Sequence, residues 1–238
     1  MADELSGGRN NMIRILFLCE GQTELDFVNE VLKPHFEARN AAITSRLFHT
    51  KTVPVDGIIP KGGLGSYKKV KTQILDICKH DPNLIVTTIV DFYGLPDDFD
   101  CVGLNKENGD IAHALEVEQR FENDINCRNF VANLMIHEFE ALLFSKPSEF
   151  AEWFDLDSVE IVQKIADTHE SPEHINSGIE TAPSKRLKQL LHGYDKAFHG
   201  PMIASQITLQ TMREKCSHFN AWITRLELLI INNNFRTC

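Results

Sequence analysis

The sequence predicts an α/β fold, in which a mostly parallel sheet is flanked by helices and followed by a helical C-terminal extension. Short apolar runs alternate with longer segments of helical periodicity, and the run Leu84–Val90 is mostly β-branched and hydrophobic along its length. Such continuous runs are typical of parallel strands, which are buried on both faces. Beyond Ser145 the pattern changes to helical segments interrupted by prolines. We therefore expect an α/β domain over 12–145 and a helical extension over 146–238 packed on it.

The N-terminal part of the chain predicts a strand, a turn and a helix. Met12–Leu18 reads as a buried strand, and Thr23–His35 carries apolar residues mainly at helical spacing. An extended region is expected around Ile43–Val55. A glycine-rich turn then leads into a second predicted helix over Tyr67–Lys79, whose apolar positions form one face.

The middle of the chain continues the alternation. The strand Leu84–Val90 ends at Asp91, a helix is expected near Ile111–Asn126, and a further strand near Phe130–Ile136. A turn into helix is expected at Glu138–Phe144. Alternating strands and helices favour a parallel sheet with right-handed crossovers.

Composition and charge restrict the class of protein. The chain has 238 residues and a formal net charge of −10, which argues against a wholly basic nucleic-acid coat but leaves a nuclease open, because acids around a metal also lower the charge. Met1–Asn11 lacks the pattern of a secretory signal, and no apolar run approaches the roughly 20 residues of a membrane span. The six scattered cysteines are interpreted as reduced thiols. We expect a soluble cytoplasmic protein without a membrane partner.

Acidic residues follow the predicted strands. Glu20 comes after the first strand, Asp91 after the strand Leu84–Val90, and Glu138 and Glu140 after the last. Because ligands bind at the carboxyl ends of parallel strands, these side chains are expected to meet there. Carboxylates suit Mg²⁺ or Mn²⁺, which can activate water and neutralise a leaving oxygen. Glu24 is a further metal ligand or an acidic residue that stabilises the first helical turn.

Each acidic residue also has a plainer interpretation as a solvated loop residue or a helix cap. His137 beside the acidic turn is interpreted as structural rather than catalytic.

Two basic segments are candidates for nucleic-acid contact. The first is the glycine turn with Lys61, Gly62 and Gly63, which could present backbone N–H groups to a phosphate or be a simple turn before a helix. The second contains Lys185, Arg186 and Lys196, which could grip a polyanion or only solvate a helix face.

Three motifs resemble those of Toprim-fold proteins, the domain shared by topoisomerases, primases and overcoming-lysogenization-defect nucleases. They are Phe17–Glu24 (FLCEGQTE), Thr88–Gly94 (TIVDFYG) and His137–Phe144 (HEFEALLF). The whole is most similar to an uncharacterised bacterial Toprim-like nuclease family with a helical C-terminal region. That likeness extends through Thr181–Leu187, Gly193–Lys196 and Cys216–Trp222, and it covers Ile13 to Leu229.

The resemblance implies Mg²⁺-dependent or Mn²⁺-dependent cleavage or joining of a nucleic-acid backbone. It implies that Glu20 is the general acid or base, and that Asp91 holds metal with Glu138 or Glu140. One position departs from the pattern, since Asp91 is followed by Phe92 and Tyr93 and the usual second aspartate is absent. Asp97 or Asp98 could substitute if the loop folds back, and two-metal catalysis depends on that.

Three functions remain open at this point. The first is a Toprim-like endonuclease that acts in bacterial defence against phage or mobile DNA, alone, as a homodimer or with an ATPase partner, as the resemblance implies. The second is a non-catalytic Toprim-like module that binds an ATPase or nucleic acid. The third is a metal-dependent phosphatase or phosphoacceptor, because an aspartate at a strand end can be a nucleophile.

Overall fold

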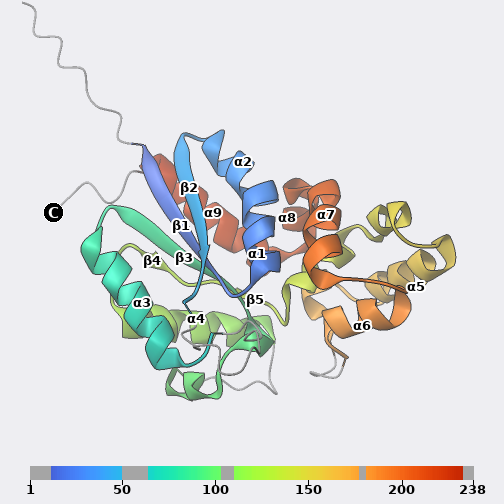
Figure 1. Ribbon diagram of the computed structural model, residues 1–238, viewed down its shortest axis with the longest axis horizontal. Coiled ribbons are helices and arrows are strands. Elements are labelled where there is room, and N and C mark those ends of the chain that lie inside the picture. Colours follow the sequence, from blue (N-terminus) through green and yellow to red (C-terminus); the bar gives the residue numbers. More distant parts are fainter. Residues whose placement is uncertain (1–11, 50–63, 103–109, 177–180, 233–238) are drawn as a thin grey trace, which may run out of the picture.

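The computed structural model describes residues 12–49, 64–102, 110–176 and 181–232. Within these residues a parallel five-stranded sheet forms the centre of the molecule, in the order β2-β1-β3-β4, with β5 also paired to β3 (Figure 1). The strands are β1 (Ile13–Cys19), β2 (Ala41–Leu47), β3 (Leu84–Asp91), β4 (Phe130–Val131) and β5 (Leu134–Met135). The predicted α/β class with a mostly parallel sheet is confirmed.

The strand register explains why acidic residues meet at one edge. β1 and β3 are neighbours, and Cys19, the last residue of β1, is paired with Ile89, two residues before the end of β3. Glu20, which follows β1, and Asp91, which ends β3, therefore lie at the same carboxyl edge. β2 extends the sheet on the other side of β1, with Cys19 beside Leu47.

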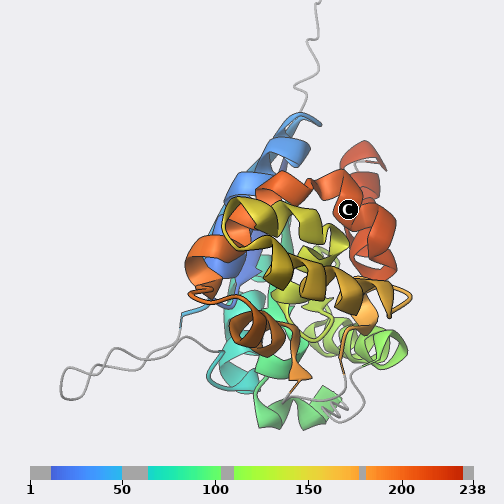
Figure 2. The ribbon, with the colours of Figure 1, turned by 90° about the vertical axis from the view of Figure 1, so that its right-hand side faces the viewer.

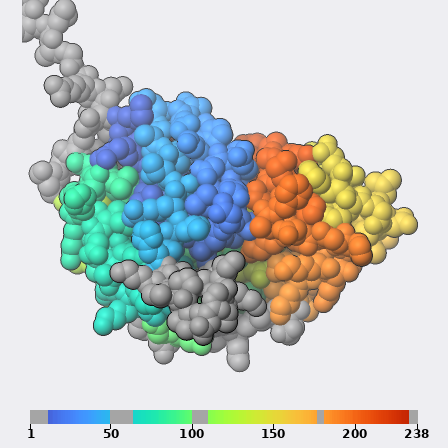
Figure 3. Space-filling view, viewed as in Figure 1, coloured from blue at the N-terminus to red at the C-terminus, as the bar shows by residue number. Residues whose placement is uncertain are grey.

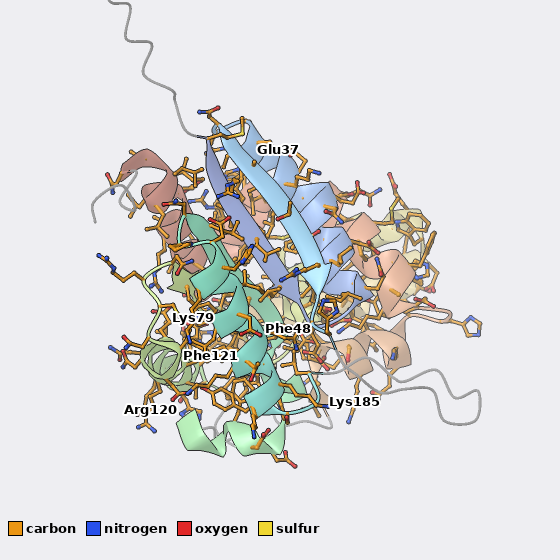
Figure 4. All side chains as sticks on the ribbon, turned by 60° about the vertical axis from the view of Figure 1, so that its left-hand side comes forward. Glu37, Phe48, Lys79, Arg120, Phe121 and Lys185 are labelled. Carbon is orange, nitrogen blue, oxygen red and sulfur yellow. The ribbon has the colours of Figure 1, made fainter. Side chains whose placement is uncertain are left out.

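Helices cover both faces of the sheet. On one face lie α3 (Tyr67–His80) and α4 (Ile111–Ile125), which pack over Leu16 and Val86. Figure 4 shows Phe121 between these two helices, where its ring lies 5.8 Å from that of Tyr67. The alternate residues of the strands face the other layer, which contains the first helical segment and the C-terminal helix α9 (Ser217–Asn232).

The helix after β1 is continuous but not regular. It runs as α1 (Gln22–Phe27), a π-helical turn η1 (Val28–Leu32) and α2 (Lys33–Glu37). Pro34 has no N–H to donate to the preceding turn, and the widened turn directly before α2 accommodates this loss. The predicted helix over Thr23–His35 is therefore present with a local π turn.

The predicted strand over Phe130–Ile136 is divided into β4 and β5. Side chains bind the backbone where the ladder breaks: Ala132 N donates to Glu122 Oε1 at 2.8 Å, and Leu134 N donates to Glu118 Oε1 at 2.6 Å. Between them, the Thr88 hydroxyl bonds both the N–H and the carbonyl of Asn133. These partners replace the strand pairing that hydrophobic pattern alone predicts.

The expected turn into helix at Glu138–Phe144 is present after β5, where the helix is the 3₁₀-helix η4 (Phe139–Ser145). His137 has a φ of 63°, in the left-handed region, and it redirects the chain at the sheet edge. The N–H of Phe139 donates to Asp91 Oδ1 at 2.7 Å, which holds the start of η4 against the end of β3.

The segments between β3 and α4 are the short 3₁₀ turns η2 (Phe92–Gly94) and η3 (Asp97–Val102). The C-terminal extension is helical, as predicted. Its part before α9 lies to the right of the sheet in Figures 1 and 3 and towards the viewer in Figure 2, whereas α9 lies behind the sheet in Figure 1. Its elements are η5 (Pro147–Glu152), α5 (Leu156–Asp167), η6 (Pro172–His174), α6 (Pro183–Leu190), α7 (Lys196–Ile207), α8 (Leu209–Lys215) and α9.

The extension shares the core of the sheet. Trp222 of α9 reaches the central strand, where its Nε1–H donates to Thr87 Oγ1 at 3.0 Å, and its ring lies 5.9 Å from Phe17 of β1. The hydrophobic core thus continues across residue 145, and the proposed boundary there stays a prediction. None of the described helices is both long and apolar enough to cross a bilayer.

Candidate active site: a buried carboxylate cluster around a lysine

Five charged side chains from separate elements meet at the carboxyl edge of the sheet. Glu20 follows β1, Glu24 lies in the first turn of α1, Asp91 ends β3 and Glu140 lies in η4, whereas Lys196 is the first residue of α7. We call these residues the carboxylate cluster. The first four were predicted at this edge, and Lys196 was predicted as a nucleic-acid contact.

The ammonium of Lys196 lies among three of the carboxylates. Its Nζ is 3.1 Å from Asp91 Oδ2, 3.1 Å from Glu140 Oε2 and 3.6 Å from Glu24 Oε1. Glu140 is fully buried and Glu24 and Asp91 nearly so, while 28% of the Lys196 side chain is exposed. The lysine therefore enters a buried anionic site from its open side.

Backbone groups hold the carboxylates in place. Glu24 Oε2 accepts a hydrogen bond from Gly21 N at 3.0 Å, so that its other oxygen faces Lys196. Asp91 uses Oδ1 to bind the N–H of Phe139 and leaves Oδ2 for the lysine. Each of these side chains thus has one oxygen fixed by the fold and one directed into the cluster.

Glu20 is held between the ends of two strands. Its Oε2 accepts a hydrogen bond from Asp91 N at 3.1 Å. A methyl group on Gly94 would come within 2.5 Å of both carboxylate oxygens of Glu20. A side chain at position 94 would therefore displace the Glu20 carboxylate. Sequence reasoning missed this contact, although Gly94 ends the second motif.

Several buried polar atoms in the cluster or beside it lack hydrogen-bond partners among the described residues. Glu24 Oε1 and Glu140 Oε1 accept no hydrogen bond there, and the Tyr194 hydroxyl has no hydrogen-bond partner there either. Tyr194 lies two residues before Lys196, and burial first, then the negative charge of Glu140, raises the pKa of its phenol. Unpartnered oxygens in a buried site indicate remaining capacity to bind a cation or water.

Burial and mutual repulsion change the ionisation of the cluster. Burial, followed by the charge of Asp91, raises the pKa of Glu20 to about 8 and that of Glu24 to about 7. The pKa of Glu140 also rises to about 8, mainly through burial and although Lys196 opposes the change. Burial disfavours the charge on Lys196, but Asp91, Glu140 and Glu24 outweigh it and raise the lysine pKa above its usual range.

The donor set of the cluster matches a hard divalent cation in charge and in atom type. Among the described residues, four carboxylates here face one ammonium, an excess of three negative charges if all are ionised. As they stand, no three His, Cys, Asp or Glu side chains in the described part of the chain are arranged to hold a metal. The carboxylates surround the lysine ammonium instead, so a metal would require them to regroup.

Glu138 has a different position from that of its neighbour Glu140. Its Oε2 accepts a hydrogen bond from Ser184 N at 2.8 Å, in the first turn of α6. It thereby stabilises the N-terminus of this helix, where negative charge is favourable. Of the two glutamates offered as alternatives by the sequence, Glu140 is the one in contact with Lys196.

Lys185 and Arg186, two of the other predicted binding residues, lie outside the cluster. Lys185 and Arg186 belong to α6, and Arg186 Nε donates to the Thr181 carbonyl at 2.7 Å. Figure 4 shows Lys185 on the opposite side of the view from Arg120 of α4. Lys61, Gly62 and Gly63 fall outside the described residues, as do residues 50–55 of the expected extended region.

The loop acids and His137 have structural contacts. Asp98 accepts hydrogen bonds from Tyr67 N at 2.8 and 2.9 Å, which places it at the start of α3 rather than beside Asp91. The His137 ring lies 5.4 Å from that of Tyr93, and its Nδ1 is 3.2 Å from Asn176 Nδ2. Burial lowers the pKa of His137 to about 4, so its ring is neutral.

Comparison with known proteins gives a family but no activity. The family model of a domain of unknown function (DUF4276) matches residues 19–227. No curated protein matches the chain in sequence. Among solved structures, the C-terminal region of the OLD protein of Xanthomonas campestris pv. campestris is similar, with 14% identity and a TM-score of 0.44. The match covers 92% of this chain and 97% of that one.

At this identity and score, the structural likeness leaves the function to be argued from the site itself. The family match is of a different kind, because it spans nearly the whole chain and includes every residue of the carboxylate cluster. The chain therefore belongs to the family of the domain of unknown function DUF4276.

Proposed function

We propose that this protein is a Mg²⁺-dependent or Mn²⁺-dependent nuclease of Toprim type, which cleaves phosphodiester bonds in nucleic acid. The observation that carries the proposal is the buried meeting of Glu20, Glu24, Asp91 and Glu140 at the carboxyl edge of a parallel sheet. This edge is where α/β proteins bind ligands. The three motifs that resemble Toprim-fold proteins include these same four residues, which supports the reaction class.

Glu24, Asp91 and Glu140 are the residues that would hold the cation, because each directs an oxygen towards one point. A bound divalent ion supplies charge neutralisation at the phosphate and a more acidic water. Their burial keeps bulk water away from the reacting group, which strengthens every electrostatic interaction there.

Glu20 is suited to proton transfer. Its pKa of about 8 lies near neutral pH, so the side chain exists in both protonation states under ordinary conditions. The hydrogen bond from Asp91 N and the contact with Gly94 fix its carboxylate beside the cation-holding residues. Glu20 can take a proton from attacking water or deliver one to the leaving oxygen.

The wider role proposed here is that of a defence effector. The substrate is DNA or RNA, with Lys185 and Arg186 as candidate contacts to its backbone beyond the cluster. An ATPase partner and a homodimer are part of the same proposal, as is action in the cytoplasm against phage or other mobile elements. Each of these rests on the motif resemblance and not on geometry.

The test is a titration of Mn²⁺ and Mg²⁺ into wild type, Glu20→Gln and Asp91→Asn, followed with labelled single-stranded and double-stranded DNA and RNA. Asp98→Asn is the matched control, since Asp98 caps α3 outside the cluster. Metal-dependent cleavage by wild type and by the control, lost in both cluster variants, supports the nuclease. Cleavage that persists in Asp91→Asn contradicts it.

A second candidate is a non-catalytic module that binds a partner protein or nucleic acid. The ion pairs of Lys196 favour it, because a lysine can replace a metal as the permanent counterion of a buried acidic site. On this interpretation Asp91→Asn lowers stability without any loss of metal binding, because no metal binds. Calorimetric titration with Mn²⁺ separates the two candidates.

A further inference from the structure

We infer that Lys196 is an internal counterion that occupies the cation position of the carboxylate cluster, so that a divalent ion binds only when this ammonium moves out. The inference rests on the proposed function and adds a regulatory property to the same site. It makes the first turn of α7 a gate for metal binding.

The Lys196 ammonium lies where the oxygens of the proposed metal ligands converge. Lys196 Nζ lies within 3.1–3.6 Å of oxygens of Asp91, Glu140 and Glu24. These oxygens come from β3, η4 and α1, and they are the same atoms that the proposed function assigns to the cation. A lysine 105 residues from Asp91 along the chain thus binds the proposed ligands directly.

The ammonium does not satisfy all the oxygens of the cluster. Glu24 Oε1 and Glu140 Oε1 are buried and have no hydrogen-bond donor in the described part of the chain. If all four carboxylates ionise, the single positive charge of Lys196 balances only one of their four negative charges. The site therefore retains both oxygens and charge that a divalent ion would satisfy better than the lysine does.

The same carboxylate oxygens cannot bind a divalent ion and the Lys196 ammonium at once. Mg²⁺ requires its ligands at about 2.0–2.1 Å in near-octahedral geometry, which leaves no room for an ammonium between the same carboxylates. Two cations a few ångströms apart in a buried site also repel each other strongly. Binding of the metal and the central position of Lys196 are therefore mutually exclusive.

The Lys196 side chain can move out of the cluster without disrupting α7. Asp195 caps α7 independently, with Oδ1 accepting hydrogen bonds from Ala197 N at 2.9 Å and Phe198 N at 3.1 Å. The Lys196 side chain is long and 28% of it is exposed, so it can turn outwards by rotation about its own bonds.

The variant test compares Mn²⁺ affinity by calorimetry in wild type, Lys196→Met and Lys196→Arg. Lys71→Met is the matched control, because Lys71 has a similarly exposed side chain and an ion pair of 2.8 Å with Asp124 on the other face of the sheet. Lys196→Met is expected to bind Mn²⁺ at least about tenfold more tightly than wild type, since the competing charge is gone. Lys196→Arg and Lys71→Met are expected to remain near wild type.

The outcomes separate the inference from the proposed function. Equal or weaker Mn²⁺ binding by Lys196→Met, while wild type binds, overturns the inference and leaves the nuclease standing. Absence of Mn²⁺ binding in every protein overturns both.

Chemical labelling of the wild type tests whether Mn²⁺ displaces Lys196, even if Lys196→Met does not fold. An amine-reactive reagent followed by peptide mass spectrometry should modify Lys196 several times faster in saturating Mn²⁺ than in EDTA. The modification of Lys71 should not change. An unchanged or slower reaction of Lys196 in Mn²⁺ contradicts displacement.

Discussion

At the scale of single residues, the chemistry of the cluster depends on the ratio of its charged groups, since four carboxylates surround a single ammonium. Glu20, Glu24 and Glu140 each have a raised pKa because burial and neighbouring carboxylates make ionisation costly. In the folded protein these groups retain protons that they would lose in the unfolded chain near neutral pH. The stability of the metal-free protein must therefore depend on pH.

We predict that the metal-free protein becomes less stable as the pH rises from about 4.5 to about 8. The native state binds more protons than the unfolded state in this window, so the free energy of unfolding falls with rising pH. Glu140→Gln removes the contribution of one group. In EDTA, the melting temperature of Glu140→Gln minus that of wild type should be higher at about pH 8.5 than at about pH 5. The same difference at both pH values contradicts the raised pKa of Glu140.

The contact between Gly94 and Glu20 gives a second prediction. Gly94→Ala places a methyl group within 2.5 Å of the Glu20 oxygens, which forces the carboxylate to move. We expect the proposed nuclease activity to fall at least about a hundredfold, since small displacements of a reacting group have effects of this size. Circular dichroism should show an unchanged fold. Full activity in Gly94→Ala would mean that the position of Glu20 is not important.

The sequence predicts part of this site well and part of it not at all. Glu20 and Asp91 could be found because they end two neighbouring parallel strands, and strand ends are visible as hydrophobic runs. Lys196 could be identified only as a basic residue in a resembling motif. Its approach to Asp91 depends on the packing of α7, which no local pattern encodes.

At the scale of elements, buried side chains determine where helices and strands begin and end. Glu173 shows this for the C-terminal helix. Its two oxygens accept hydrogen bonds from His218 N at 3.0 Å and Phe219 N at 2.9 Å, in the first turn of α9. Glu173 is almost fully buried, so these N–H groups have no access to water as a substitute.

We predict that Glu173→Ala lowers the free energy of unfolding by roughly 2–4 kcal/mol, because it leaves the buried N–H groups of His218 and Phe219 without their acceptor. Asp155→Ala is the control. Asp155 caps α5 through Ser158 N at 2.9 Å but lies on the surface, where water can replace the lost cap, so Asp155→Ala should lower the free energy of unfolding less. Urea denaturation measures both values. Equal losses for the two variants would show that burial does not increase the importance of the Glu173 contacts.

Element positions were predictable where the hydrophobic pattern acts alone. The expected strands at Met12–Leu18 and Leu84–Val90 and the helix at Tyr67–Lys79 agree with the structure within one residue at each end. The expected strand at Phe130–Ile136 failed to form as one piece because Glu118 and Glu122 bind its backbone from α4. Such long-range side-chain contacts cannot be read from periodicity.

At the scale of the whole molecule, the helical extension completes the core of the sheet. Trp222 and Phe219 of α9 pack against Phe17 and Phe27, which belong to the first strand and helix of the chain. Without the extension, this face of the sheet would expose a large apolar surface to water.

We predict that residues 12–145 do not fold when expressed alone, and that the full chain unfolds in one cooperative transition. Differential scanning calorimetry should give a single peak, and Trp222→Ala should lower its temperature as a whole, since the ring spans both regions. The corresponding fragment should bind a hydrophobic dye and lack near-ultraviolet dichroism. Two separate peaks would instead indicate independent domains.

The order of the elements along the chain also has a consequence for biosynthesis. Glu20, Glu24, Asp91 and Glu140 are all translated before Lys196, and Trp222 later still. A nascent chain that folds from its N-terminus would bring acidic residues together with no lysine to neutralise them. The cluster can therefore close only near the end of translation. Incomplete chains released from the ribosome before α7 and α9 would lack both the counterion of the cluster and the helix that completes the core.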